Sequence, residues 1–319
     1  MKKVVVIEPG YLDYGEEESV LSKYDARVVP LAIGTPKQKV LEEVEDADAI
    51  LVREAIVDAQ IIDAAKQCKV VVRYGVGVDN INLGYAKEKG IYVANVPDYG
   101  SEDVAEHALS LLVSATRRIV TRDKDVHQGK WGIGQAEPIP RMGGKILGVV
   151  GFGRIARCFA EKASGLGFRN TLVFDPALTT EQAQESGVQK VDLETLICES
   201  DFISLHAPLN ENTRHMVNAE LIGKMKPMAV LVNTSRGGLV DEQALYDALK
   251  ENRIHAAGID VFETEPVLRD NPLLTLPNAI CTDHTAWFTE ESVVELQHKG
   301  ALEVLRVFDG QKPKSWVNQ

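Results

Sequence analysis

The sequence has 319 residues, of which 45% are hydrophobic and 26% are charged, as is typical of a globular protein large enough for two domains. Lys and Arg number 35 against 47 Asp and Glu, so the net charge is −12, and no basic run occurs. Nucleic-acid binding normally rests on clustered cations, so the sequence argues against a nucleic-acid partner. The apolar run near the N-terminus covers only residues 4–7, and we expect no membrane partner.

The cysteines are widely separated in the sequence: Cys68, Cys158, Cys198 and Cys281. None belongs to a C-x-x-C pair. This pattern is typical of small buried side chains in a reducing compartment. We therefore predict a cytoplasmic protein without a metal site.

The N-terminal third alternates short apolar strands with polar-faced helices. Strands are predicted at residues 4–7, around Val28, and at 49–52, 69–74 and 91–95, with helices such as 37–44 and 83–89 between them. This alternation predicts a parallel, doubly wound sheet. No glycine-rich turn follows the first strand, where Glu8 and Pro9 stand before Gly10, so this part should bind nucleotides poorly.

A glycine loop, RYGVGVDN at residues 73–80, follows the fourth of these strands. Two glycines followed by Asp-Asn could expose consecutive backbone N–H groups that hold a carboxylate. On these residues alone, a simple glycine turn is the more economical interpretation. A hinge is then predicted near Pro97, a long helix from Ser101 towards His127, and a loop over residues 128–144.

Residues 145–175 have the pattern of strand, glycine turn, helix and second strand. The segment GFGRIA at 151–156 matches G-x-G-x-x-G/A directly after an apolar strand. In such a turn the glycines allow a tight exit and a close approach to pyrophosphate, and the helix N-terminus attracts the anion. Asp175 closes the second strand, where an acid accepts hydrogen bonds from the ribose hydroxyls of NAD and disfavours NADP.

Polar side chains follow the later predicted strands, which lie at 201–206, 228–233, 255–261 and 279–282. Ligands bind outside the carboxyl ends of parallel strands, so these groups should share one edge with the cofactor. Arg236 could clamp a carboxylate, His284 could exchange a proton, and Glu265 could orient the imidazole. Each of these three residues alone is typical of an exposed loop. Together they meet the requirements of hydride transfer to a 2-oxo acid.

These motifs resemble those of D-isomer-specific 2-hydroxyacid dehydrogenases nearly from end to end. The matching blocks are RYGVGVDNIN, VPDYGSEDVAEHAL, GVVGFGRIA, NTSRGGLVDEQAL, GIDVFETEP and CTDHTAW. The resemblance implies an α/β protein in which a Rossmann NAD-binding domain, residues 100–286, is inserted into a flavodoxin-like substrate domain, residues 1–99 and 287–319. It also implies NAD as cofactor, a small 2-oxo or 2-hydroxy acid as substrate, and a homodimer formed through the NAD-binding domain.

The resemblance assigns roles to individual residues. Arg236, Glu265 and His284 are the implied catalytic residues. The expected cofactor-binding residues are Gly151, Gly153, Arg154, Ile155, Asp175, His206, Ala207, Pro208, Thr213, Thr234 and Asp260. The expected substrate-binding residues are Arg73, Tyr74, Val76, Gly77 and Trp287. Val76 and Gly77 would contribute backbone N–H groups, which replaces the simple-turn interpretation of that loop.

Aromatic side chains suggest which substrate is preferred. Tyr74 and Trp287 could offer apolar surface to the substrate, which would favour apolar 2-oxo acids over glyoxylate or phosphorylated hydroxypyruvate. The alternative is that these rings pack the interface between the two predicted domains. Asp283 departs from the family, in which many members have proline before the histidine.

Two other functions fit the same motifs. C-terminal-binding protein corepressors resemble the block CTDHTAWFTEES and keep the Arg, Glu and His set. The compact chain, without a long tail for partners, favours a metabolic enzyme. Phosphoglycerate dehydrogenase is disfavoured because the sequence ends at Gln319 without an appended regulatory domain, although short forms exist.

Overall fold

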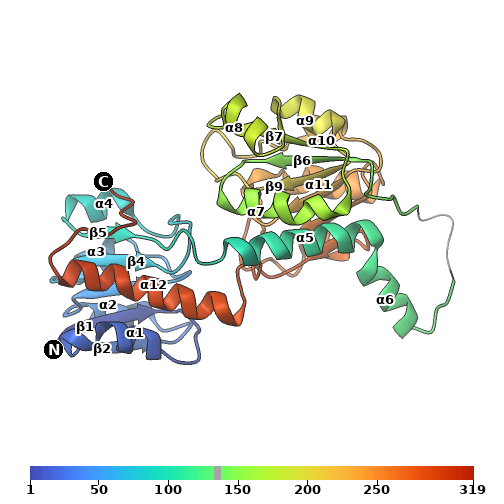
Figure 1. The fold of residues 1–319 in the computed structure, drawn as a ribbon. Helices are drawn as coiled ribbons and strands as arrows, with labels where there is room; N and C mark the ends of the chain where they lie inside the picture. The colour runs from blue at the N-terminus through green and yellow to red at the C-terminus, as the bar shows by residue number, and fades with distance from the viewer. Residues whose placement is uncertain (133–137) are drawn as a thin grey trace. The chain divides into compact units, whose positions relative to one another are not determined.

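The computed structural model describes residues 1–132 and 138–319. These residues form two compact units, Met1–Gly100 with Thr289–Gln319, and Ser101–Phe288. The first unit is discontinuous in sequence, because the second is inserted between its two segments (Figure 1).

The first unit is built on a five-stranded parallel sheet with the order β2-β1-β3-β4-β5. Its strands are β1 (Lys3–Ile7), β2 (Arg27–Leu31), β3 (Ala49–Val52), β4 (Val70–Arg73) and β5 (Tyr92–Ala94). Strands β3 and β4 are buried along their whole length, as continuous apolar runs predict for a sheet covered on both faces. The strand order is that of flavodoxin-like doubly wound folds.

Helices flank this sheet. They are α1 (Gly15–Leu21), α2 (Lys37–Val44), α3 (Ala59–Ala64), α4 (Leu83–Glu88) and α12 (Glu290–Phe308), with a 3-10 turn at Ser22–Tyr24. The C-terminal helix α12 begins with a capping box between Thr289 and Ser292, and it packs on α1 and β4. On this helix Leu302 is 38% exposed, whereas Val304 is buried.

The second unit contains a seven-stranded parallel sheet with the order β12-β11-β10-β9-β6-β7-β8. Its strands are β6 (Ile146–Val150), β7 (Asn170–Phe174), β8 (Gln189–Lys190), β9 (Phe202–Leu205), β10 (Val230–Asn233), β11 (Ala256–Ile259) and β12 (Ala279–Cys281). The order reverses between β6 and β9, which is the topological switch point of a Rossmann sheet. The fold class expected from the sequence, α/β with two doubly wound parallel sheets, is confirmed.

The helices of this unit are α5 (Ser101–Arg117), α6 (Ile119–His127), α7 (Arg154–Ala163), α8 (Thr180–Glu185), α9 (Leu193–Glu199), α10 (Ala219–Lys224) and α11 (Glu242–Lys250). Three 3-10 turns lie at Ser164–Leu166, Gly237–Leu239 and Pro272–Thr275. Helix α5 packs on α7 and on β10 and β11. None of its described helices is long and apolar enough to cross a membrane, and the same holds for the first unit.

The helix predicted from Ser101 towards His127 is in fact two helices. Arg118 adopts a left-handed conformation with φ 53°, which ends α5 and starts α6 in a new direction (Figure 1). Helix α5 buries side chains against the sheet, whereas α6 buries none in this chain. The loop predicted at 128–144 has no helix or strand in its described parts, and residues 133–137 lie outside the described residues.

Candidate active site

The glycine turn joins β6 to α7. Gly151 has φ 84°, and a Cβ there would lie 2.7 Å from the carbonyl oxygen of His206, so only glycine fits. A Cβ on Gly153 would meet nothing within 4 Å, which shows open space above this residue. Gly153 is also the N-cap of α7, and it has no side chain to cap the first N–H groups. The turn is therefore shaped to receive an anion at a helix N-terminus.

Asp175 lies directly after β7, beside this turn. Its carboxylate accepts hydrogen bonds from the backbone N–H of Phe152 at 2.7 Å and of Ala177 at 2.8 Å. These bonds hold the carboxylate at the carboxyl edge of the sheet, next to the phosphate-binding turn. Arg154 and Ile155 occupy the first two positions of α7.

Two buried polar atoms lie at the ends of β9 and β10. His206 Nδ1 and Thr234 Oγ1 have no hydrogen-bond partner among the described residues. Burial lowers the pKa of His206 to about 3, so this imidazole is neutral, and its Nε2 pairs with Ser204 Oγ at 2.9 Å. Unpaired buried polar atoms are costly, and a polar ligand at this edge would satisfy them. The residues present therefore fit a dinucleotide.

The other predicted cofactor contacts surround these atoms. Ala207 is buried and Pro208 exposed, directly after His206. Thr213 Oγ1 donates to Pro208 O at 2.7 Å and accepts from Asn210 N at 2.8 Å, so this hydroxyl closes the loop after β9. Direct contact of Thr213 with a cofactor stays a prediction.

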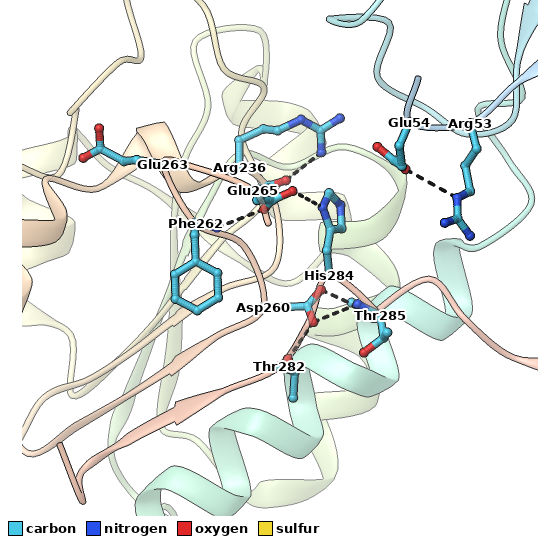
Figure 2. A network of polar contacts seen from close by, with 12 residues as sticks. Arg53, Glu54, Arg236, Asp260, Phe262, Glu263, Glu265, Thr282, His284 and Thr285 are labelled. Atoms are coloured by element: carbon cyan, nitrogen blue, oxygen red, sulfur yellow. Dashed lines mark hydrogen bonds and ion pairs between the residues drawn. The ribbon is translucent and has the colours of Figure 1, made fainter. Parts of the chain in front are cut away.

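The candidate catalytic pair is His284 with Glu265. His284 Nδ1 lies 2.6 Å from Glu265 Oε2, and Glu265 Oε1 accepts from the backbone N–H of Phe262 at 2.9 Å (Figure 2). Burial raises the pKa of Glu265, but the hydrogen bond and charge of His284, the Phe262 N–H and the charge of Arg236 outweigh it, so the pKa falls below its ordinary value. Glu265 is therefore a carboxylate at neutral pH that fixes the imidazole from one side.

Arg236 lies in the turn after β10, near this pair. Its Nη1 donates to Ser235 O at 2.7 Å, and Asn233 Nδ2 donates to Arg236 O at 2.9 Å. A Cβ on the next residue, Gly237, would lie 1.9 Å from the carbonyl carbon of Phe262, so glycine is required for the turn to pack on the loop that bears Glu265. The structure thus brings Arg236, Glu265 and His284 together (Figure 2).

Asp260 holds the loop that presents His284. Its fully buried carboxylate accepts from Thr282 Oγ1 at 2.6 Å, Thr285 N at 3.1 Å and Ala286 N at 3.0 Å. His284, with φ 57°, donates its own N–H to Asp260 O at 2.8 Å. Direct contact of Asp260 with the cofactor stays a prediction.

Sequence reasoning missed His107, on α5. Its Nε2 lies 3.1 Å from Thr282 Oγ1 and 3.5 Å from Asp260 Oδ1, so it braces the same loop from the helix side. His107 lies within the block VPDYGSEDVAEHAL. Its helical spacing places it on the side of the helix that faces the sheet, and a histidine there could have been identified as a candidate from the sequence.

The glycine loop of the first unit follows β4. Gly75 has φ 138°, and Val76 is 45% exposed. Gly75 O accepts from Val96 N at 2.9 Å, and Val76 O accepts from Asn95 Nδ2 at 2.6 Å. Within the described residues, no hydrogen bond uses the backbone N–H of Val76 or Gly77. These two donors remain available to a ligand.

The prediction that Tyr74 faces the substrate is wrong. Its side chain is 1% exposed, and its hydroxyl donates to Glu17 inside the first unit. A Cβ on Gly300 of α12 would lie 2.8 Å from the ring, which shows how closely the ring packs there. Side chains alternate along an extended segment, so Tyr74 points to the helix-covered face. Trp287 is partly exposed and meets Phe288 edge to face at 5.5 Å; its substrate role stays a prediction.

The fold and site define a class: dinucleotide-dependent dehydrogenases whose Rossmann sheet carries an Arg, Glu and His cluster at its carboxyl edge. Residues 109–286 match the family model for the NAD-binding domain of D-isomer specific 2-hydroxyacid dehydrogenases. The chain is 42% identical over 289 residues to a glyoxylate reductase of Korarchaeum cryptofilum, covering 89% of this chain and 86% of that one.

Two further comparisons agree. A D-3-phosphoglycerate dehydrogenase of Methanocaldococcus jannaschii is 40% identical over 320 residues, which cover 100% of this chain and 60% of that protein. The structure of D-lactate dehydrogenase from Aquifex aeolicus with NAD and lactic acid matches with a TM-score of 0.85 and 28% identity, covering 96% of each chain. The chain belongs to the D-isomer specific 2-hydroxyacid dehydrogenase family. It is an NAD-dependent oxidoreductase that acts on 2-hydroxy acids.

Proposed function

We propose that the protein interconverts a small 2-oxo acid and the corresponding D-2-hydroxy acid. The observation that carries this proposal is the 2.6 Å contact between His284 Nδ1 and Glu265 Oε2, beside Arg236. Oxo-acid reduction needs a proton donor for the oxygen, a cation for the carboxylate and a group that orients the donor, and these three side chains match those needs.

In the proposed mechanism, each residue has one task. NADH supplies the hydride when bound. His284 donates a proton from Nε2 to the carbonyl oxygen, because Glu265 holds Nδ1. Arg236 grips the substrate carboxylate with its planar guanidinium. As the family resemblance implies, the backbone N–H groups of Val76 and Gly77 are proposed as further substrate contacts.

The proposed cofactor contacts follow the edge of the second sheet. Gly151, Gly153 and the N-terminus of α7, with Arg154 and Ile155, receive the pyrophosphate. Asp175 would accept hydrogen bonds from the ribose hydroxyls. The buried polar atoms of His206 and Thr234, which have no partner among the described residues, would bond to the cofactor.

The sequence favours an apolar substrate group, but that preference now rests on Trp287, because the Tyr74 ring is buried. Relatives are named for glyoxylate and for phosphoglycerate, neither of which has an apolar side chain. We therefore propose a small 2-oxo acid and assign no apolar side chain to it.

The proposed homodimer and cytoplasmic location have separate supports. Helix α6 buries no side chain in this chain, as expected for a surface that a second copy covers. All four cysteines are free thiols, and burial raises the pKa of Cys68 to about 12, which suits a reducing compartment.

A substrate panel tests the proposed function. NADH oxidation is followed with glyoxylate, pyruvate, 2-oxobutyrate and hydroxypyruvate, and chiral analysis of the product should give the D-hydroxy acid. Turnover of none of these acids, combined with NADH-dependent assembly, would favour a corepressor-like function instead. Product of the L configuration would contradict the family assignment of the reaction.

A further inference from the structure

A carboxylate lies beside the glycine loop of the first unit and has no part in the proposed mechanism. Glu54 follows β3, and its Oε1 accepts from Arg73 Nη2 at 3.1 Å. The same oxygen lies 4.0 Å from Arg53 Nε (Figure 2). The Glu54 side chain is 52% exposed, whereas that of Arg73 is 10% exposed. The ion pair is therefore buried on the arginine side and open to solvent on the carboxylate side.

Arg73 links this carboxylate to the loop. A Cβ on Gly75 would lie 1.5 Å from Arg73 Nη1, so the guanidinium occupies the space directly over the first glycine. Only glycine at position 75 permits this stacking, and Glu54 binds the outer edge of the same guanidinium. The carboxylate is thereby held next to the loop that contains Val76 and Gly77.

The backbone around Glu54 is fixed to the same loop. Asn80 Nδ2 donates to Arg53 O at 3.0 Å and to Ala55 O at 2.8 Å, one residue on each side of Glu54. Val57 N donates to Asn80 O at 2.8 Å. These hydrogen bonds tie the backbone of residues 53–57 to the end of the glycine loop and so fix the backbone position of Glu54 relative to that loop.

Tyr11, after β1, adds a neutral donor to this edge. Its hydroxyl is buried and has no hydrogen-bond partner among the described residues, and its ring packs edge to face on Tyr74 at 5.4 Å. Arg73 Nε is also buried and has no hydrogen-bond partner among the described residues. Polar groups of both signs thus converge at the carboxyl ends of β1, β3 and β4, where ligands of open α/β sheets bind.

We propose that Glu54 is a specificity residue, which selects a 2-oxo acid with a neutral hydroxyl on its distal carbon over one with a phosphate there. The inference rests on the proposed function, because it takes the substrate to bind at the Val76 and Gly77 loop. The Glu54 carboxylate accepts a hydrogen bond from a hydroxyl on the distal carbon of the substrate and repels a phosphate there. A methyl group at that carbon makes no polar contact with it. The hydrogen bond from Arg73 holds the carboxylate in place.

Three 2-oxo acids that differ only in the group on the distal carbon, together with glyoxylate, test this proposal. Glyoxylate has no such carbon and serves as the reference; 2-oxobutyrate, hydroxypyruvate and phosphohydroxypyruvate carry methyl, hydroxyl and phosphate groups. For the wild type we expect kcat/KM for hydroxypyruvate to exceed that for 2-oxobutyrate by about tenfold or more, as for a site built to hydrogen-bond a hydroxyl. Phosphohydroxypyruvate should be the poorest of the four.

Glu54→Gln removes the charge at constant shape. It should raise kcat/KM for phosphohydroxypyruvate, relative to glyoxylate, by about tenfold, because like-charge repulsion is lost. Glu54→Asp keeps the charge and should keep the wild-type ranking. Glu88→Gln, on an exposed turn of α4, makes the same change in net charge and controls for it.

The outcomes separate the inference from the proposed function. If the wild type reduces 2-oxo acids but Glu54→Gln and Glu88→Gln give the same ranking, the role of Glu54 is overturned while the proposed function stands. A wild type that prefers the phosphorylated acid would also overturn the role of Glu54 and leave the proposed function standing. A wild type that reduces none of the acids overturns both.

Discussion

At His284 the two ring nitrogens have different surroundings. Nδ1 is 2.6 Å from Glu265, so it carries a proton towards that carboxylate, and Nε2 is left for the substrate. We expect His284→Ala to lower kcat by about a hundredfold or more, the range of general acid–base catalysis. NADH binding, measured by fluorescence titration, should persist because the glycine turn is distant in sequence and intact. A near-normal kcat would remove His284 from the mechanism.

Glu265 gives a prediction in pH. Its pKa lies below the ordinary value despite burial, so it is a carboxylate across the neutral range, and its Oε2 lies 2.6 Å from the His284 ring. Glu265→Gln should therefore move the alkaline limb of kcat/KM for oxo-acid reduction to lower pH, by about one pH unit or more. Glu263→Gln, a carboxylate in the same loop, is the matched control. The pairing would be wrong if both variants kept the wild-type profile.

Asp175 should set the choice of cofactor. Its carboxylate, held by Phe152 N and Ala177 N, would meet a 2′-phosphate with like charge. Asp175→Asn keeps an acceptor oxygen and removes the charge, so the preference for NADH over NADPH in kcat/KM should narrow about tenfold. Equal use of both cofactors by the wild type would contradict this assignment.

At the scale of elements, a buried carboxylate joins α1 to α12 and β4. Glu17 accepts from Tyr74 Oη and from Gln297 Nε2 at 3.0 Å. Burial raises its pKa above the ordinary 4.5, although the hydrogen bonds oppose the rise. Folding thus favours the protonated form, and this stability is fully present below pH 4.5 and is lost as pH rises through the raised pKa.

In the variant Glu17→Gln the side chain cannot ionise, so the variant should not lose this stability as the pH rises. The difference in Tm between Glu17→Gln and wild type should therefore become more favourable to the variant as pH rises from about 5 to 8. Thermal melts at several pH values measure it, with the exposed Glu18→Gln on the same helix as control. A difference that is constant with pH would contradict the raised pKa.

Elements with strong local signals were predictable from the sequence, and those set by tertiary contacts were not. Continuous apolar runs predicted the strands, and G-x-G-x-x-A predicted the turn into α7, because one local conformation satisfies each pattern. The break at Arg118 left no such signal, since arginine rarely adopts φ 53°. The direction of Tyr74 depends on which face α12 covers, and that helix comes from the other end of the chain.

The candidate site follows the same division. Arg236, Glu265 and His284 could be predicted because each follows a strand whose end lies at one sheet edge. The supports beneath them could not be. His107 comes from a helix and Asp260 bonds three separate groups of one loop, and these contacts exist only in the folded unit. The position of Glu54 likewise depends on Arg73 and Gly75, which belong to a different strand and loop, so its role could not be predicted from its own segment.

At the scale of the whole molecule, α6 and the residues after it expose unusual apolar surface. Ile119, Val120 and Val126 are each 53% exposed, and Trp131 is 92% exposed. A hollow of about 380 Å³ lies between α6 and Trp131. Large exposed apolar side chains gathered on one element are typical of interaction sites, and two-fold symmetry lets the same surface serve both copies.

We therefore expect light scattering to give about twice the chain mass of 35.0 kDa. Val126→Asp with Trp131→Ala should shift the mass towards one chain, because a charge is placed in the contact and its largest apolar side chain is removed. Leu12→Asp, at an exposed leucine of the first unit, controls for surface charge. NADH binding and circular dichroism show that the variant is folded. A wild type with the mass of one chain would exclude the dimer. A double variant that stays dimeric would show that the contact lies elsewhere on the chain.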